Sequence, residues 1–279
     1  MTKRHIGIMQ GRLVPPYEGR IQAFPRDNWR DEFGRAKDAG IDGIEWIFDA
    51  YGDDVNPIVT ESGIEEMRAL SQQTGVQVRS VCADYFMDYP LIRCSDGERD
   101  ERLGRLHDLL ERGARLGIRY VILPFVDAAK IDSEAEMREF VRLAKERILP
   151  AAAKTGTEIH LETSLPPASV RWVLSRIRES HFRINYDSGN SSSLGYKPDE
   201  EFLAYGDRIG SVHIKDRVLG ASTVPLGSGS ADFDRVFANL AETAYDGSFI
   251  LQVARGQDGE EVEWARRNRA WLEQRLQHI

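Results

Sequence analysis

The segment 158–162, Glu158-Ile159-His160-Leu161-Glu162, decides the fold class, because its alternating apolar residues are typical of a short β-strand. Similar short apolar runs recur along the chain, beginning roughly 35 residues apart on average, which is about the length of one βα unit. The eight runs cover residues 6–9, 43–47, 76–81, 120–123, 158–162, 182–187, 209–214 and 249–253.

The stretches between these runs have the periodicity of amphipathic helices. Residues 62–70 begin one such stretch, with Ser62 and Glu65 spaced as in a capping box. Strands that alternate with helices predict a parallel sheet. No Gly-x-Gly-x-x-Gly motif follows the first run and no linker interrupts the eight units. We therefore expect an α/β fold, a (β/α)₈ barrel, formed by residues 1–279 as a single domain.

Composition narrows the class of protein further. The 279 residues are 41% hydrophobic and 29% charged, and no apolar run approaches the roughly 18 residues of a membrane-spanning helix. We expect a cytoplasmic protein without a membrane partner, since the basic start does not lead into a secretory apolar stretch. Cys82 and Cys94 are too few for a disulfide framework. The net charge of −8 argues against a nucleic-acid partner.

Polar residues stand at the C-terminal ends of four predicted strands. Parallel barrel strands are normally apolar on both faces, so an inward-pointing polar residue needs a reason. Alternation along the run 158–162 places Glu162 inside the barrel near its C-terminal rim. The same reasoning brings Asp187, His213 and Gln252 to that rim from the next three strands. Barrel enzymes carry their catalytic groups at this end.

Glu162, Asp187, His213 and Gln252 therefore predict a binding site for one divalent metal ion. Two carboxylates, an imidazole and an amide oxygen suit Mn²⁺ first, with Co²⁺, Mg²⁺ and Zn²⁺ as alternatives. The competing interpretation is a buried polar network that only closes the mouth of the barrel. His160 lies one layer below Glu162, so we expect it to support the ligands rather than to bind the ion.

Several segments carry a family resemblance when they are taken together. They are Met9-Gln10-Gly11-Arg12-Leu13, Gly43-Ile44-Glu45-Trp46-Ile47, Leu161-Glu162-Thr163, Asn185-Tyr186-Asp187-Ser188-Gly189-Asn190, Val212-His213-Ile214-Lys215-Asp216-Arg217 and Val224-Pro225-Leu226-Gly227-Ser228-Gly229. The combination resembles the xylose isomerase-like barrel superfamily over nearly the whole chain. Within it, the chain is most similar to the sugar phosphate isomerase and epimerase group, which includes ketose 3-epimerases and hexulose-phosphate isomerase-like proteins. The resemblance implies a metal held by Glu162, Asp187, His213 and a residue on the last strand.

The chain also departs from this family pattern. Ketose 3-epimerases have a second glutamate where this chain has Gln252, and an amide cannot take a proton near neutral pH. We therefore expect Glu162 to be the principal base and to favour transfer between adjacent carbons over inversion of one carbon. Asn190 stands where related enzymes often have a histidine. The apurinic endonuclease branch needs further histidines, but the ends of strands three and four offer Cys82, Ala83, Leu123 and Pro124.

Further residues are candidates for contact with the substrate. Besides Glu162, the candidate catalytic residues are Glu45, which alternation turns inward, and Lys215, which is able to polarise a carbonyl or hold a phosphate. The candidate substrate-binding residues are Asn190, Arg217, Arg255, Gly227 and Gly229, the two glycines through backbone amides at the start of a helix. The competing interpretations are a structural carboxylate, solvated loop charges and glycines that only shape a turn.

Three functions remain open at this point. The first is isomerisation or epimerisation of a small sugar or sugar phosphate through an enediolate, with a divalent metal as cofactor. The second shares the metal and the base but ends in elimination, as in a lyase or dehydratase acting on a keto-inositol or keto-glycoside. The third is a sugar-binding relative without catalysis. The resemblance also suggests a homo-oligomer.

Overall fold

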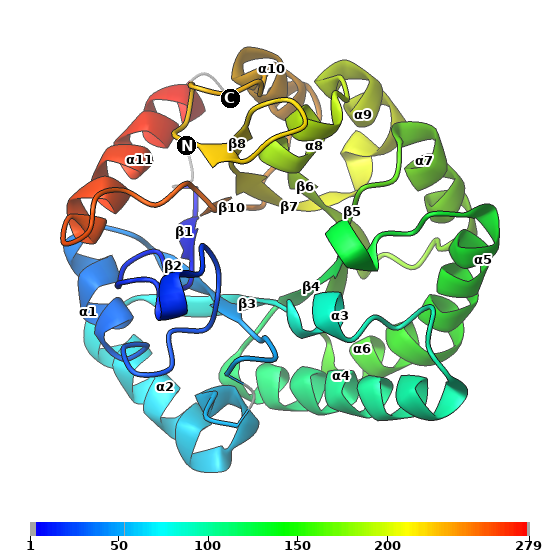
Figure 1. The fold of residues 1–279 in the computed structure, drawn as a ribbon, viewed down its shortest axis with the longest axis horizontal. Helices are drawn as coiled ribbons and strands as arrows, with labels where there is room; N and C mark the ends of the chain where they lie inside the picture. Colours follow the sequence, from blue (N-terminus) through cyan, green and yellow to red (C-terminus); the bar gives the residue numbers. More distant parts are fainter. Residues whose placement is uncertain (1–3, 53, 278–279) are drawn as a thin grey trace.

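A computed structural model describes residues 4–52 and 54–277 and confirms the closed (β/α)₈ barrel. Figure 1 looks along the barrel and shows the strands ringed by helices. Parallel pairing of the first and last barrel strands closes the ring, with Ile6 opposite Phe249. The barrel strands are β1 (Ile6–Met9), β2 (Gly43–Ile47), β3 (Gln77–Cys82), β4 (Tyr120–Phe125), β5 (Glu158–Thr163), β6 (Phe182–Asp187), β7 (Ile209–Ile214) and β10 (Ser248–Leu251).

All eight predicted runs are strands, and only their ends differ from expectation. The last strand stops at Leu251, so Gln252 lies just beyond it instead of within it. Its backbone N–H still donates to the carbonyl of Ile214 at 3.1 Å, which holds Gln252 beside β7. In the register between β6 and β7, Asp187 is the direct partner of His213. The barrel pairing itself thus places these two side chains next to each other.

Helices follow the strands and cover the outside of the barrel (Figure 1). The α-helices are α1 (Asp31–Asp38), α2 (Glu61–Thr74), α3 (Tyr85–Asp88), α4 (Asp96–Leu116), α5 (Glu134–Leu143), α6 (Leu149–Thr155), α7 (Pro167–Arg176), α8 (Ser188–Leu194), α9 (Pro198–Tyr205), α10 (Phe233–Glu242) and α11 (Glu261–Leu276). Short 3₁₀ segments are η1 (Tyr17–Gly19), η2 (Pro57–Val59), η3 (Asp127–Ala129) and η5 (Gly206–Arg208), and η4 (Ala144–Ile148) is a π turn. A two-stranded hairpin of β8 (Asp216–Arg217) and β9 (Thr223–Val224) follows β7.

The capping box predicted at Ser62 is wrong. Helix α2 begins two residues earlier than that pattern requires, and its N-cap is Thr60, whose side chain accepts a hydrogen bond from the N–H of Gly63. Glu65 therefore lies beyond the third helical position, where a capping box needs its glutamate. The capping box with both reciprocal hydrogen bonds is at the start of α4, between Ser95 and Glu98.

The outer faces of the first strands pack against an aromatic cluster. Trp46 of β2 is fully buried, and its ring lies 5.8 Å from Phe24, 5.7 Å from Trp29 and 6.2 Å from Phe33 between centroids. Its indole N–H donates to Asn56 Oδ1 at 2.9 Å. Trp46 thus packs on the helix side of β2, and the cluster anchors helix α1 and the loop after β1.

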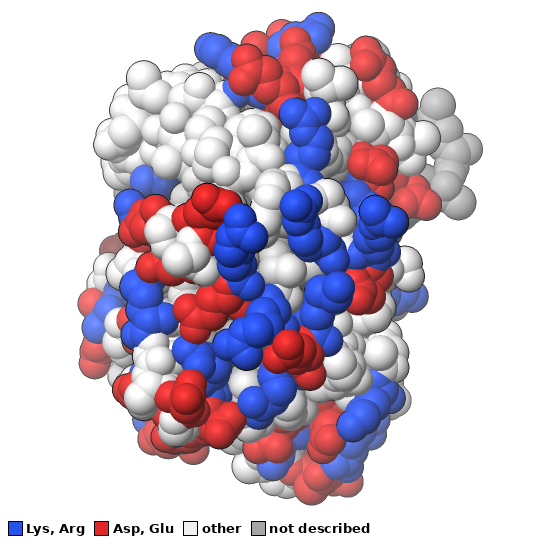
Figure 2. Space-filling view, turned by 90° about the vertical axis from the view of Figure 1, so that its right-hand side faces the viewer, with Lys and Arg blue, Asp and Glu red and all other residues white. Residues whose placement is uncertain are grey.

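Acidic and basic side chains are interspersed on the face of the molecule that Figure 2 shows. Figure 2 shows them alternating over the helices seen at the right of Figure 1, with a region free of both signs at the upper left. Ion pairs such as Arg30 with Glu66 and Arg147 with Asp100 join exposed residues far apart in the sequence. Exposed pairs of this kind stabilise a protein little, about 0–1 kcal/mol each. Among the described helices, none combines the length and the apolar character needed to cross a membrane.

Replacing Trp46 with alanine should destabilise the fold strongly. The substitution leaves a cavity in the aromatic cluster and removes the indole hydrogen bond to Asn56. The expected loss is about 3–5 kcal/mol of unfolding free energy. Urea titration monitored by circular dichroism measures this loss. Trp172 on α7 is only half buried and serves as the control, because its replacement should cost clearly less. Equal losses for the two variants would contradict the assigned packing.

Candidate metal centre

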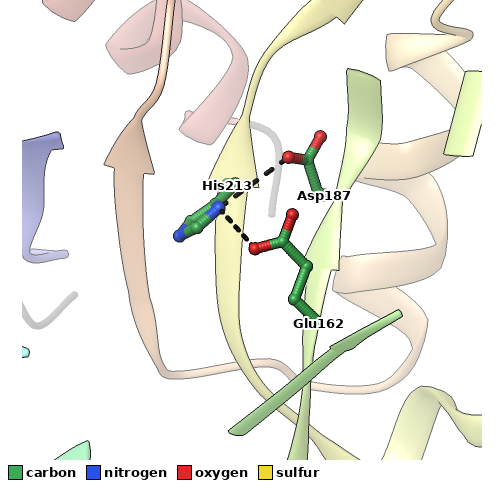
Figure 3. A group of neighbouring side chains, drawn as sticks. All are labelled: Glu162, Asp187 and His213. Carbon is green, nitrogen blue, oxygen red and sulfur yellow. Dashed lines mark ion pairs between the residues drawn. The ribbon is translucent and has the colours of Figure 1, made fainter. Parts of the chain in front are cut away.

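Three buried side chains meet at the C-terminal end of the barrel. Glu162 comes from β5, Asp187 from the last position of β6, and His213 from β7, and each offers one ligand atom within 4.8 Å of the others. His213 Nδ1 lies 3.8 Å from Glu162 Oε2 and 3.8 Å from Asp187 Oδ2 (Figure 3). Two ligands of one ion at about 2.1 Å are separated by about 3.0 Å when adjacent and 4.2 Å when opposite. The observed spacing therefore suits a divalent cation between them.

Asp187 is held in place by the helix that follows it. Its Oδ1 accepts hydrogen bonds from the backbone N–H groups of Gly189 and Asn190, both at 2.8 Å, as the N-cap of α8. This leaves Oδ2 directed toward His213 and toward Lys215 Nζ, which is 3.4 Å away. Burial alone would raise the pKa of Asp187, but Lys215 and His213 lower it to about 2. The carboxylate is thus kept ionised, as a metal ligand must be.

His213 is oriented by a buried carboxylate on the other side of its ring. Glu45 Oε1 lies 2.7 Å from His213 Nε2, and Ser80 Oγ donates to Glu45 Oε2 at 2.7 Å. Burial would lower the pKa of His213, but the charge of Glu45 and hydrogen bonds with Asp187 and Glu45 raise it to about 10. A cation at Nδ1 would displace the proton there, while Nε2 would keep the proton that faces Glu45.

Glu45 therefore lies against Nε2 of His213. It is fully buried and does not border the cavity described below. Alternation along β2 correctly turns it into the barrel, and the contact that it makes there is with the imidazole.

A second chain of polar contacts supports His213 from the layer below. His160 Nδ1 lies 2.8 Å from Ser211 Oγ, which donates to Asn185 Oδ1 at 2.7 Å, and Asn185 Nδ2 is 3.1 Å from His213 Nδ1. His160 also stacks on Tyr120 with ring centroids 4.2 Å apart. The expected position of His160, one layer below Glu162, is confirmed.

Gln252 presents an oxygen without a partner. Its Nε2 donates to Gln22 Oε1 at 3.0 Å, which fixes the orientation of the amide. Its Oε1 is buried and has no hydrogen-bond partner among the described residues. An unpaired buried acceptor is costly, about 1–3 kcal/mol, unless a ligand or cation satisfies it. This atom therefore fits the role of a fourth ligand.

A cavity of about 300 Å³ opens above the centre and is bordered by Glu162 and Gln252. Burial raises the pKa of Glu162 to about 7, against the lowering influence of His213. The other charged or amide side chains that line the cavity are Arg12, Arg20, Gln22, Asp49, Asp84, Asp88, Asp127, Asn190, Lys215 and Arg217. A space of this size suits a small polar molecule.

Asn190 connects Glu162 to the basic residues of the rim. Its Nδ2 donates to Glu162 Oε1 at 2.6 Å. Its Oδ1 accepts from Lys215 Nζ at 3.3 Å and from Arg217 Nη1 at 3.0 Å. The structure thus brings together Glu162, Asn190, Lys215 and Arg217 on one wall of the cavity.

The loop with Gly227 and Gly229 does not reach this cavity. The backbone N–H groups of both glycines already donate to Asp216 Oδ2, at 2.9 and 2.8 Å, so a carboxylate of the chain occupies the amides that we expected to hold an anion. Arg255 also stays outside, because its guanidinium donates to the carbonyls of Ile21 and Val14. The structure does not bring these three residues to the other candidate substrate-binding residues.

Sequence reasoning missed Arg12, Gln22 and Asp84. Arg12 belongs to one of the segments that carry the family resemblance, so a signal for it was present. Asp84 stands two residues beyond the end of β3, and Gln22 lies in the long loop after β1. Strand alternation places only residues within strands, and it says nothing of loop side chains that fold back over the rim.

Comparison with known proteins places the chain in a family. Residues 33–275 match the sequence profile described as the xylose isomerase-like TIM barrel. The chain is 25% identical to an L-ribulose-5-phosphate 3-epimerase of Escherichia coli strain K12 over 233 residues, which are 81% of this chain and 82% of that protein.

Solved structures share the fold over nearly the whole length. A 3-keto-D-glucoside 4-epimerase from Escherichia coli superimposes with a TM-score of 0.73 at 22% identity, covering 98% of this chain and 100% of that one. The IOLI protein with a bound zinc atom superimposes with a TM-score of 0.77 at 16% identity, covering 96% of this chain and 97% of that one.

Proposed function

Because this chain belongs to the xylose isomerase-like TIM barrel family, we propose that it is a divalent-metal-dependent isomerase or epimerase of a small sugar or sugar phosphate. The observation that carries the proposal is the position of Glu162, whose carboxylate borders both the candidate metal centre and the cavity. The relative named as an L-ribulose-5-phosphate 3-epimerase supports the same reaction class. The reaction would pass through an enediolate.

We propose that Glu162, Asp187, His213 and Gln252 hold the ion. The donor set of carboxylates, imidazole and amide oxygen favours Mn²⁺, with Co²⁺, Mg²⁺ and Zn²⁺ as alternatives. When bound, such an ion would withdraw electron density from the carbonyl and neighbouring hydroxyl of a sugar and make the adjacent C–H more acidic. The unpaired Oε1 of Gln252 supports its inclusion.

The chain's own groups would then move the proton and hold the substrate. Glu162 takes the hydrogen from carbon, while the hydrogen bond from Asn190 keeps its carboxylate turned toward the cavity. Lys215 places a positive charge beside Asp187 and the cavity, where it stabilises negative charge that develops on a sugar oxygen. Glu45 fixes the imidazole of His213 and does not line the cavity, so it would not meet the substrate.

One divalent ion should bind per chain. Elemental analysis after dialysis is expected to find close to one equivalent in the wild-type protein and a large loss in His213→Ala. Glu45→Gln should weaken binding about 10–100-fold, because the imidazole loses its orienting carboxylate. His107→Ala, on the outside of α4, is the matched control with unchanged metal content. Equal metal in the wild-type and His213→Ala proteins would refute the ligand assignment.

Glu162→Gln should abolish exchange of the substrate's carbon-bound hydrogen with deuterated water, because an amide cannot accept the proton. NMR of a ketose panel, incubated with metal-loaded enzyme in D₂O, measures the exchange. Glu146→Gln is the control, since Glu146 is exposed on the outer turn η4 and does not line the cavity. Exchange near the wild-type rate in metal-loaded Glu162→Gln would overturn the assignment of the base.

We also propose that the substrate is anionic. Arg20, Lys215 and Arg217 border the cavity, and Arg217 Nη1 is anchored by Asn190. Arg217→Ala should raise KM for a phosphorylated ketose at least tenfold, because the phosphate loses a charge-assisted contact. KM for the corresponding free ketose should change much less, because the free sugar has no phosphate to lose that contact. Steady-state kinetics on the matched pair test this. A wild-type enzyme with no preference for the phosphorylated sugar would exclude the phosphate.

A further inference from the structure

Inversion at one carbon needs two proton-carrying groups. A hydrogen leaves one face of the carbon and another arrives on the opposite face, and a single fixed carboxylate reaches only one of them. Glu162 serves one face under the proposed function, on which the following inference rests. Gln252 directly follows β10, which is separated from β5 by β7 and β6 in the strand order. Its side chain is an amide, which neither accepts nor donates this proton.

The cavity offers few carboxyl groups for the second face. Apart from Glu162, the lining includes Asp49, Asp84, Asp88 and Asp127. Both oxygens of Asp49 accept backbone hydrogen bonds, from Phe24 at 2.7 Å and from Gly52 at 2.9 Å, so this group shapes the loop. Asp88 and Asp127 are exposed at the rim. Asp84 is the remaining carboxyl group of the lining, and it is only partly exposed.

Asp84 is tied to Gln252 through one amide. Gln22 Nε2 donates to Asp84 Oδ2 at 2.7 Å, and Gln22 Oε1 accepts from Gln252 Nε2 at 3.0 Å. Arg12 Nη2 donates to the same Gln22 Oε1 at 3.2 Å, so the amide of Gln22 has one orientation that satisfies all three contacts. Asp84 thus approaches the cavity from the side of β3, β1 and β10, whereas Glu162 approaches it from β5.

We infer that Asp84 is the second catalytic acid and base, which exchanges a proton with the face of the substrate opposite Glu162. In one direction, the C–H bond breaks and its proton passes to the Glu162 carboxylate, leaving the electron pair in the enediolate. The carboxylic acid of Asp84 then gives its proton to the other face of the same carbon, and a new C–H bond forms. Glu162 ends protonated and Asp84 ionised, and exchange with water restores both.

The surroundings of Asp84 agree with a proton-carrying role. Burial raises the pKa of its carboxyl group, partly offset by hydrogen bonds from Gln22 and Cys82. Cys82 Sγ lies 3.1 Å from Asp84 Oδ1, so each oxygen has one neighbour of the chain. The group is thereby held in a defined position while it still borders the cavity.

Asp84→Asn in the metal-loaded, full-length enzyme separates the two proton transfers. L-ribulose 5-phosphate and free L-ribulose in D₂O are the first probes, and NMR follows deuterium uptake and epimer formation separately. The variant is expected to keep Glu162-dependent deuterium uptake within a few-fold of wild type, while epimer formation falls at least 100-fold. Asp84→Ser, which keeps an acceptor for Gln22, is the second variant and should show the same separation. Asp100→Asn on α4 is the control with both rates unchanged.

The other possible results separate a failure of the role of Asp84 from a failure of the proposed function. Equal loss of uptake and epimer formation in both Asp84 variants, or epimer formation at the wild-type rate, overturns the role of Asp84 and leaves the proposed function standing. A wild-type enzyme that moves the carbonyl without forming an epimer also overturns the role of Asp84 alone. A wild-type enzyme with neither uptake nor conversion on either probe, nor on a wider ketose panel, overturns the proposed function and this inference with it.

Discussion

The buried contact between Glu45 and His213 is the interaction on which the candidate centre depends. The two side chains come from β2 and β7, they are fully buried, and they meet at 2.7 Å inside the barrel. A buried carboxylate without this partner would be strongly destabilising, about 3–5 kcal/mol when one member of such a pair is removed. The contact turns Nδ1 of the imidazole toward Glu162 and Asp187. Closure of the barrel is therefore coupled to the geometry of the centre.

Much of this centre could be predicted from the sequence because strand geometry is regular. Side chains alternate along a strand, and neighbouring parallel strands end at one rim, so the depth of Glu162, Asp187 and His213 follows from counting residues. The position of Gln252 at the rim was predicted in the same way. The prediction of its position holds although Gln252 lies just past its strand, because its N–H continues the pairing to Ile214. The fold was predictable for the same reason.

The loops were beyond such reasoning. Glycines after β9 predicted an anion site, but Asp216 folds back from β8 and takes the N–H groups of Gly227, Gly229 and Ala231. Asp84 and Gln22 lie in loops of different strands, and their contact joins residues 62 positions apart. Nothing in the residue order predicts which loop amide faces which carboxylate, because the pairing depends on how two rim loops pack together.

An amide at position 252 also changes how charge is distributed in the site. Under the proposed ligand assignment, Glu162 and Asp187 would together balance the charge of one divalent ion, and Gln252 would add a ligand oxygen without further charge. Arg12 is buried nearby and donates to the carbonyls of Ile21 and Val253 and to Gln22. Its guanidinium is therefore linked through Gln22 both to Gln252 and to the carboxyl group of Asp84. Under the two proposals, Gln252 would bind the metal and Asp84 would donate the proton on that side of the cavity. A glutamate at position 252 would have to do both.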